Sequence, residues 1–89
     1  MPRICVVKEQ MPPRTFQGSE GLVTVVELLL SDGLNTFIAT ASEKDSSALI
    51  SNPLAPGTYI SVMLQFTALK GDKGYFQKCR LIKWGLYAF

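Results

Sequence analysis

The sequence predicts an all-β domain in which five strands form a small barrel, with a short helix or loop between the third and fourth strands. Three observations support this prediction. Short runs rich in β-branched residues recur along the chain, turns containing glycine or proline separate them, and one run alternates between apolar and polar residues. The 89 residues suffice for one domain, spanning 1–89, and are too few for two.

The first three strands are expected in the first 40 residues. Residues 3–9 are short and β-branched, and Pro12 and Pro13 follow them, which predicts an extended loop because proline cannot donate to a strand ladder. The run from Leu22 to Leu30 is almost continuously apolar, which predicts a central second strand buried on both faces. The turn at 31–35 contains glycine and asparagine, so residues 36–40 should return as the third strand of a hairpin.

The second half of the chain supplies the helix and the last two strands. A capping-box pattern at 42–45 predicts a short helix or an ordered loop that ends before Asn52-Pro53. In residues 59–68 the even positions are apolar and should face the core. A glycine-bounded tip at 70–74 precedes a fifth strand from Tyr75 to about Trp84, with Cys79 and Leu81 inside and Lys78 and Arg80 outside. This order of elements is that of an OB-type barrel.

Composition argues against catalysis. The chain has no histidine and two cysteines, which excludes Ser-His-Asp and Cys-His arrangements and the usual mixed zinc sites. No glycine-rich phosphate-binding pattern occurs. We therefore expect a protein that is not an enzyme and has no cofactor, no metal site and no small-molecule substrate. Cys5 and Cys79 should be small buried residues, and a disulfide between them requires neighbouring strands.

Hydropathy predicts a soluble, cytoplasmic protein without membrane contact. The apolar run at the amino terminus turns polar at Lys8-Glu9-Gln10 and is too short for a signal peptide. No other stretch approaches membrane-spanning length.

Basic residues are concentrated near the carboxy terminus. Residues 70–89 contain five of the nine basic residues and one of the seven acids, whereas residues 1–69 contain four bases and six acids. Cations attract a phosphodiester backbone and aromatic rings stack on unpaired bases, so this pattern favours single-stranded nucleic acid. A solvated strand face with ordinary core aromatics is the alternative. The residues expected to contact nucleic acid here are Lys70, Lys73, Tyr75, Lys78, Arg80 and Lys83, with Phe76 replacing Tyr75 if that ring faces the core.

The stretch 55–81 contains a series of short motifs in a characteristic order. It has an Ala-Pro-Gly-Thr-Tyr turn at 55–59, an aromatic residue at Phe66, a lysine-containing tip between Gly71 and Gly74, and the pair Arg80-Leu81. In this order and spacing the stretch resembles the carboxy-terminal half of the gene V proteins of filamentous bacteriophages, which are helix-destabilising, single-stranded DNA-binding proteins.

The resemblance implies a five-stranded OB-like fold, a two-fold homodimer, and largely nonspecific, cooperative coating that sequesters single strands during phage DNA replication, in the host cytoplasm if the protein is viral. Arg80 matches the family's basic residue in the last strand, and the tip at 70–75 matches the hairpin that carries a binding aromatic. Phe37 lies near an aromatic of the family's third strand. In the shorter counterpart of the family's basic wing, residues 14–21, Arg14 and Phe16 can substitute for the family's wing residues.

Several alternatives remain open. Phe16 is either a binding ring or a plug under its loop, and Phe37 and Phe66 lie on apolar strand faces that favour the core. The alternative function is a small β-barrel protein-interaction module that uses apolar edge strands and the aromatic tail at 84–89. A homodimer is also expected on physical grounds, because symmetric pairing would bury the surplus apolar surface of such a small domain.

Overall fold

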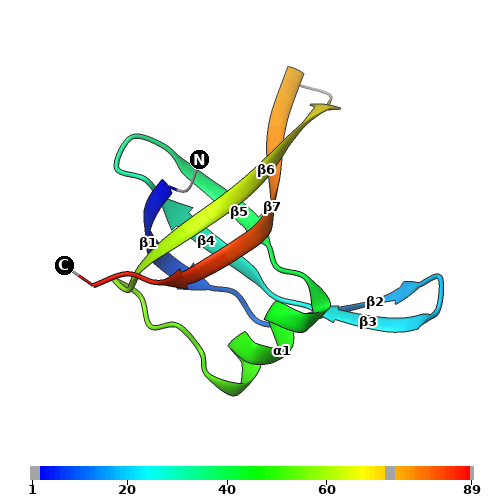
Figure 1. Ribbon diagram of the computed structural model, residues 1–89. Coiled ribbons are helices and arrows are strands. Elements are labelled where there is room, and N and C mark those ends of the chain that lie inside the picture. The colour runs from blue at the N-terminus through cyan, green and yellow to red at the C-terminus, as the bar shows by residue number, and fades with distance from the viewer. Residues whose placement is uncertain (1–2, 72–73, 89) are drawn as a thin grey trace.

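Five strands close a barrel in a computed structural model that describes residues 3–71 and 74–88, and the side chains of residues 3–66 and 79–88 (Figure 1). The order around the barrel is β1 (Arg3–Gln10), β4 (Glu27–Ser31), β5 (Thr36–Thr40), β7 (Gly74–Leu86) and β6 (Tyr59–Gly71), and β6 pairs back to β1. Neighbouring strands are antiparallel except β5 and β7, which are parallel. The helix α1 (Glu43–Ser51) connects β5 to β6. The predicted all-β, OB-like barrel is therefore confirmed.

A two-stranded wing, β2 (Arg14–Gly18) and β3 (Gly21–Val25), projects from the barrel beside α1 (Figure 1). The prediction of one central strand over 22–30 is therefore wrong, as is that of a loop continuing beyond Arg14. The chain leaves the ladder at Val26, whose amide donates to Ser46 Oγ (2.8 Å) and whose carbonyl accepts from the Ala41 amide (3.0 Å). These long-range bonds end β3, so the run divides between the wing and the barrel.

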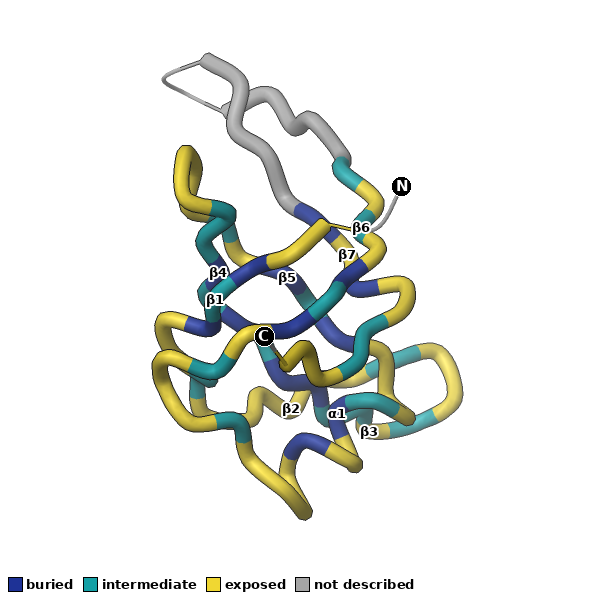
Figure 2. The backbone as a smooth tube through the Cα atoms, turned by 60° about the vertical axis from the view of Figure 1, so that its left-hand side comes forward, coloured by how far each residue is buried: buried dark blue, intermediate teal, exposed yellow. Residues whose placement is uncertain are grey.

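Close packing shapes the tip of the wing. Gly18 pairs with Gly21, and a Cβ added at Gly18 would lie 2.7 Å from Val23 Cγ2, so a larger residue there would force a shift. Gly21 has a φ of 124°, which L side chains rarely adopt. The wing carries less buried surface than the barrel strands, and Leu22 is exposed (Figure 2). Its apolar residues therefore do not make it a second core.

The hydrophobic core fills the barrel and extends to α1. Its buried residues are Cys5, Val7, Val26, Leu28, Leu30, Ala39, Ala41, Leu49, Ile60, Val62, Cys79 and Leu81. The inward direction predicted for the even positions of β6 is confirmed by Ile60 and Val62, and Leu64 and Phe66 pack against the same core; Ala68 lies outside the described side chains. Cys79 and Leu81 face inward as predicted.

The helix begins with the predicted cap, since Ser42 Oγ accepts from the Asp45 amide (3.1 Å). It packs one side against the barrel end through Leu49, which is fully buried. Gln10 of β1 ties the helix to the following segment, because its side chain donates to the Leu49 carbonyl and accepts from the Leu54 amide. In the part of the chain that the structure describes, no helix is long and apolar enough to cross a membrane.

Candidate nucleic-acid interface

One line of residues crosses the outer surface of the barrel from β4 to β6. Glu27 pairs with Thr40, Thr40 with Arg80, and Arg80 with Gln65. Residues directly opposite each other in a ladder share a face of the sheet, and Thr40 Oγ1 donates to the Glu27 carboxylate (3.2 Å). Arg80 is exposed, as predicted, whereas its neighbours in sequence, Cys79 and Leu81, are buried. The line therefore places Arg80 on the outer wall, with β5 on one side and β6 on the other.

We call the outer surface of the described parts of β5, β6 and β7 the basic face. It presents Arg80 and Lys83, both exposed, and none of its described residues is acidic. Apolar side chains lie among these cations: Ile38, Ile82 and Met63 are 42, 48 and 40% exposed. A face of this kind offers cations to phosphates and apolar surface to bases.

A β-bulge in β7 changes which side chains point to the basic face beyond Leu81. Met63 pairs with Lys83 and Leu64 with Leu81, so Ile82 is an extra residue on β7. The extra residue changes the alternation of β7, which brings Lys83 to the outer face while Trp84 packs against the core. The strand period already turns Ile82 and Met63 outward, and sequence reasoning missed them as members of the site because it looked there for cations and aromatic rings.

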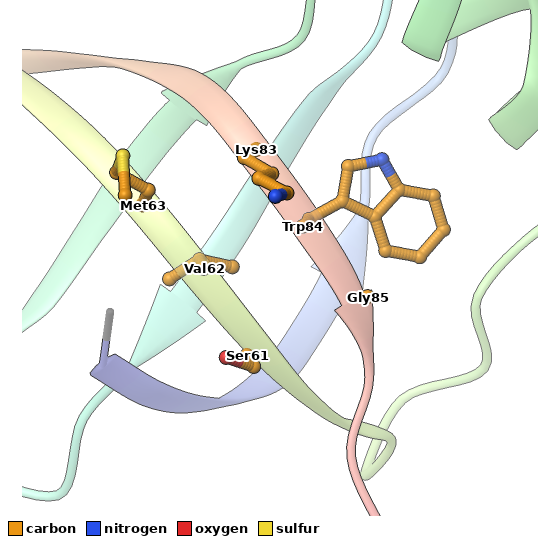
Figure 3. Close-up of a pocket in the computed structure, with 6 residues that line it drawn as sticks. All are labelled: Ser61, Val62, Met63, Lys83, Trp84 and Gly85. Atoms are coloured by element: carbon orange, nitrogen blue, oxygen red, sulfur yellow. The ribbon is translucent and has the colours of Figure 1, made fainter. Parts of the chain in front are cut away.

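A shallow pocket of about 330 Å³ lies where β6 and β7 pair beyond the bulge (Figure 3). Three consecutive residues of each strand line it: Ser61, Val62 and Met63 of β6, and Lys83, Trp84 and Gly85 of β7. Lys83 thus belongs both to the basic face and to the rim of a hollow.

An ion pair joins the wing to β4, the strand that lies next to β5 at the edge of the basic face. Arg14 Nε lies 3.1 Å from Glu27 Oε1, and Glu27 is the acid at the β4 end of the line that contains Arg80. Phe16 lies on strand β2, opposite Val23, and is 48% exposed. The loop position expected for Phe16 is therefore corrected to a strand position.

Phe37 lies on the inner side of the barrel wall, at the barrel end near Arg3. It pairs with Leu30 and packs edge to face on Phe66, with ring centroids 5.6 Å apart. The Arg3 guanidinium lies 5.1 Å from the Phe66 centroid and 5.9 Å from that of Phe37, and it also pairs with Asp32 at 3.4 Å. The structure thus brings Phe37 to the core and to Arg3, on the opposite side of the wall from Arg80.

The remaining predicted contact residues lie outside the described side chains. They are Lys70, Lys73, Tyr75 and Lys78.

The two cysteines are free, buried thiols. Burial raises the pKa of Cys79 to about 11, and its Sγ donates to the Ile38 carbonyl at 3.0 Å. Burial also raises the pKa of Cys5. Both stay protonated at neutral pH, whereas nucleophiles and metal ligands need the thiolate. Among residues whose side chains the structure describes, no group of three or more histidine, cysteine or acidic residues is placed to hold a metal ion.

The sequence matches no model of a known protein family and no curated protein. The resemblance to the gene V proteins stays a prediction.

Proposed function

We propose that this protein binds single-stranded DNA without catalysis and largely without regard to sequence. The observation that carries the proposal is the basic face: Arg80 and Lys83 both stand on the outer side of β7 in an OB-like barrel, among exposed apolar residues of β5, β6 and β7 and with no described acid on those three strands. Barrels of this type commonly bind oligonucleotides across a strand face.

The chemistry of the face suits an unpaired strand better than a duplex. The two cations would neutralise phosphates and release condensed counterions, which contributes affinity without reading sequence. Ile38, Ile82 and Met63 would contact the flat faces of bases, and in a duplex those faces are already stacked on one another.

The narrower role rests on the resemblance to the phage family. It extends the proposal to a homodimer in the cytoplasm, or in the host cytoplasm if the protein is viral, that coats single strands and sequesters them during DNA replication. The exposed Leu22 of the wing and Leu86 of β7 offer apolar surface for pairing. Light scattering coupled to size exclusion tests the dimer: a mass near the 9.8 kDa of one chain at micromolar concentration would reject it.

The proposed function is tested by fluorescence anisotropy with labelled oligo(dT) and with a duplex of equal length, each at low and physiological salt. We expect tighter binding to oligo(dT) and an affinity that falls steeply as salt rises. A preference for duplex would reject the proposal, and so would an affinity that salt does not change. Salt-independent behaviour would favour the alternative, a protein-interaction module that binds through exposed apolar residues such as Leu86.

A further inference from the structure

The pocket between β6 and β7 is a notch in the outer wall made by a missing side chain. Ser61 pairs with Gly85, and Met63 with Lys83, so these four residues share the outer face. Val62 and Trp84 pair between them and belong to the inner face, where both pack in the core. A Cβ built at Gly85 would meet no heavy atom within 4 Å, so the space above this glycine is open.

The residues that line the notch differ in chemistry. Val62 and Trp84 pair at its middle, and beside them lie the Ser61 hydroxyl, the Met63 thioether and the Lys83 chain (Figure 3). Its volume, about 330 Å³, is at the low end of the range of small-ligand sites, roughly 300–1,000 Å³. The notch is therefore large enough for one small ring system and is not the size of a protein-binding groove.

We propose that this notch holds one unpaired base of a bound DNA strand, with Lys83 on an adjacent phosphate. This inference rests on the proposed function and assigns it a specific base site. A thioether packs well on an aromatic ring, as Met63 would on a base. A hydroxyl both donates and accepts hydrogen bonds, so Ser61 would accept the polar edge of any base and would not select a sequence.

The charged residues around the notch favour an anionic polymer as its occupant. The notch is continuous along β7 with Arg80: Arg80 is opposite Gln65 and Lys83 is opposite Met63, so the two cations are two residues of β6 apart, or roughly 7 Å along the strand. No described residue of β5, β6 or β7 is acidic, so the surroundings attract an anionic polymer. A strand that follows β7 would meet both cations and present a base to the notch between Met63 and Ser61.

Gly85→Leu tests the inference, because its Cβ would meet no heavy atom within 4 Å and the rest of its side chain would occupy the notch. Gly85 is not among the glycines with positive φ in the described chain, so a leucine there carries no backbone penalty. We expect affinity for oligo(dT) to fall about tenfold, since loss of one stacked base is a stacking-sized effect. The salt dependence should be unchanged, because no cation is removed. Ser47→Leu, on the exposed side of α1, is the matched control and should bind as the native protein does.

An abasic oligonucleotide of equal length separates base from phosphate contacts. Gly85→Leu should bind it as tightly as the native protein does, whereas Arg80→Ala should weaken binding to both oligonucleotides. Met63→Ala gives a second route if Gly85→Leu does not fold: its side chain is exposed, and its loss should weaken binding to oligo(dT) a few-fold and leave abasic binding unchanged.

The outcomes distinguish the two proposals. If folded Gly85→Leu and Met63→Ala bind oligo(dT) with native affinity while Arg80→Ala is weakened, the base site is overturned and the proposed function stands. If Arg80→Ala also binds as tightly as the native protein, or if the native protein does not bind oligo(dT), the proposed function fails and the base site fails with it.

Discussion

The arginines of the amino-terminal part and the cations of β7 have different surroundings. Arg3 and Arg14 each lie in an ion pair, with Asp32 and Glu27 respectively. Arg80 and Lys83 have no acidic partner among the described residues. The difference shows that the number of cations does not measure the surface available to an anion. What matters is which residues surround each cation: β4 and the turn after it place Glu27 and Asp32 beside Arg14 and Arg3, whereas the described residues of β5 and β6 that flank Arg80 and Lys83 are neutral.

The largest expected effect comes from reversing the charges on β7. Arg80→Glu with Lys83→Glu should lower affinity for oligo(dT) by roughly 100-fold at low salt, because two attractive phosphate contacts become repulsive. Lys8→Glu with Lys44→Glu is the matched control, since it changes the net charge equally on exposed positions of β1 and α1. Equal losses in the two double variants would mean that net charge, and not the basic face, governs binding.

Arg3 should contribute to stability and leave binding unaffected. Arg3→Ala removes a guanidinium that lies over Phe37 and Phe66 and pairs with Asp32. For a partly exposed residue the loss should be about 1 kcal/mol of unfolding free energy. Chemical denaturation measures this loss, and anisotropy at a temperature where the variant is folded should give native affinity. A folded variant that bound oligo(dT) several-fold more weakly would place Arg3 in the interface.

Removing the acidic partner of Arg14 should leave this cation available to phosphates, as Arg80 and Lys83 of β7 are. Glu27→Gln removes the carboxylate that pairs with Arg14 and keeps an oxygen that accepts from Thr40. We expect a rise of about threefold in affinity for oligo(dT), since one cation is freed and one acid is removed beside the basic face. Arg14→Ala in the Glu27→Gln background should cancel the gain. No gain in the single variant would show that the wing lies outside the path of the strand.

The smallest expected effect is on the pH dependence of thermal stability, through Asp32 in the turn after β4. Amide donors at Asn35 and Leu34 hold the pKa of Asp32 below its ordinary value of 3.8. A carboxyl whose pKa is lowered by folding stabilises the fold above its unfolded pKa and loses that contribution as pH falls through the folded value. The Tm difference between the native protein and Asp32→Asn should therefore be largest near neutral pH and shrink below pH 3.8. The same difference at both pH values would contradict this account.

Much of the barrel could be predicted from local patterns. Alternation in β6, the turn before β5 and the cap of α1 each follow from residues close together in sequence, and the structure agrees with them. The resemblance to the phage family implied a wing over residues 14–21, but the division of the apolar run at Val26 could not be predicted, because it depends on a hydrogen bond to Ser46, twenty residues away.

The candidate site was predictable only where it depends on residues close together in sequence. The outward direction of Arg80 follows from the strand period. The outward direction of Lys83, which the strand period alone would turn inward, depends on a bulge, and the pairing of Arg14 with Glu27 depends on how the wing folds back on β4. Neither feature has a local signal in the sequence.

The central claim is that Arg80 and Lys83 neutralise phosphates of a single strand. Its most direct test is the slope of log affinity against log salt for oligo(dT), measured for the native protein and for Arg80→Ala with Lys83→Ala. Each phosphate contact on a single strand contributes about 0.7 to the magnitude of the slope, so the double variant should be shallower by roughly 1.4. An equal slope for the two proteins would contradict the account.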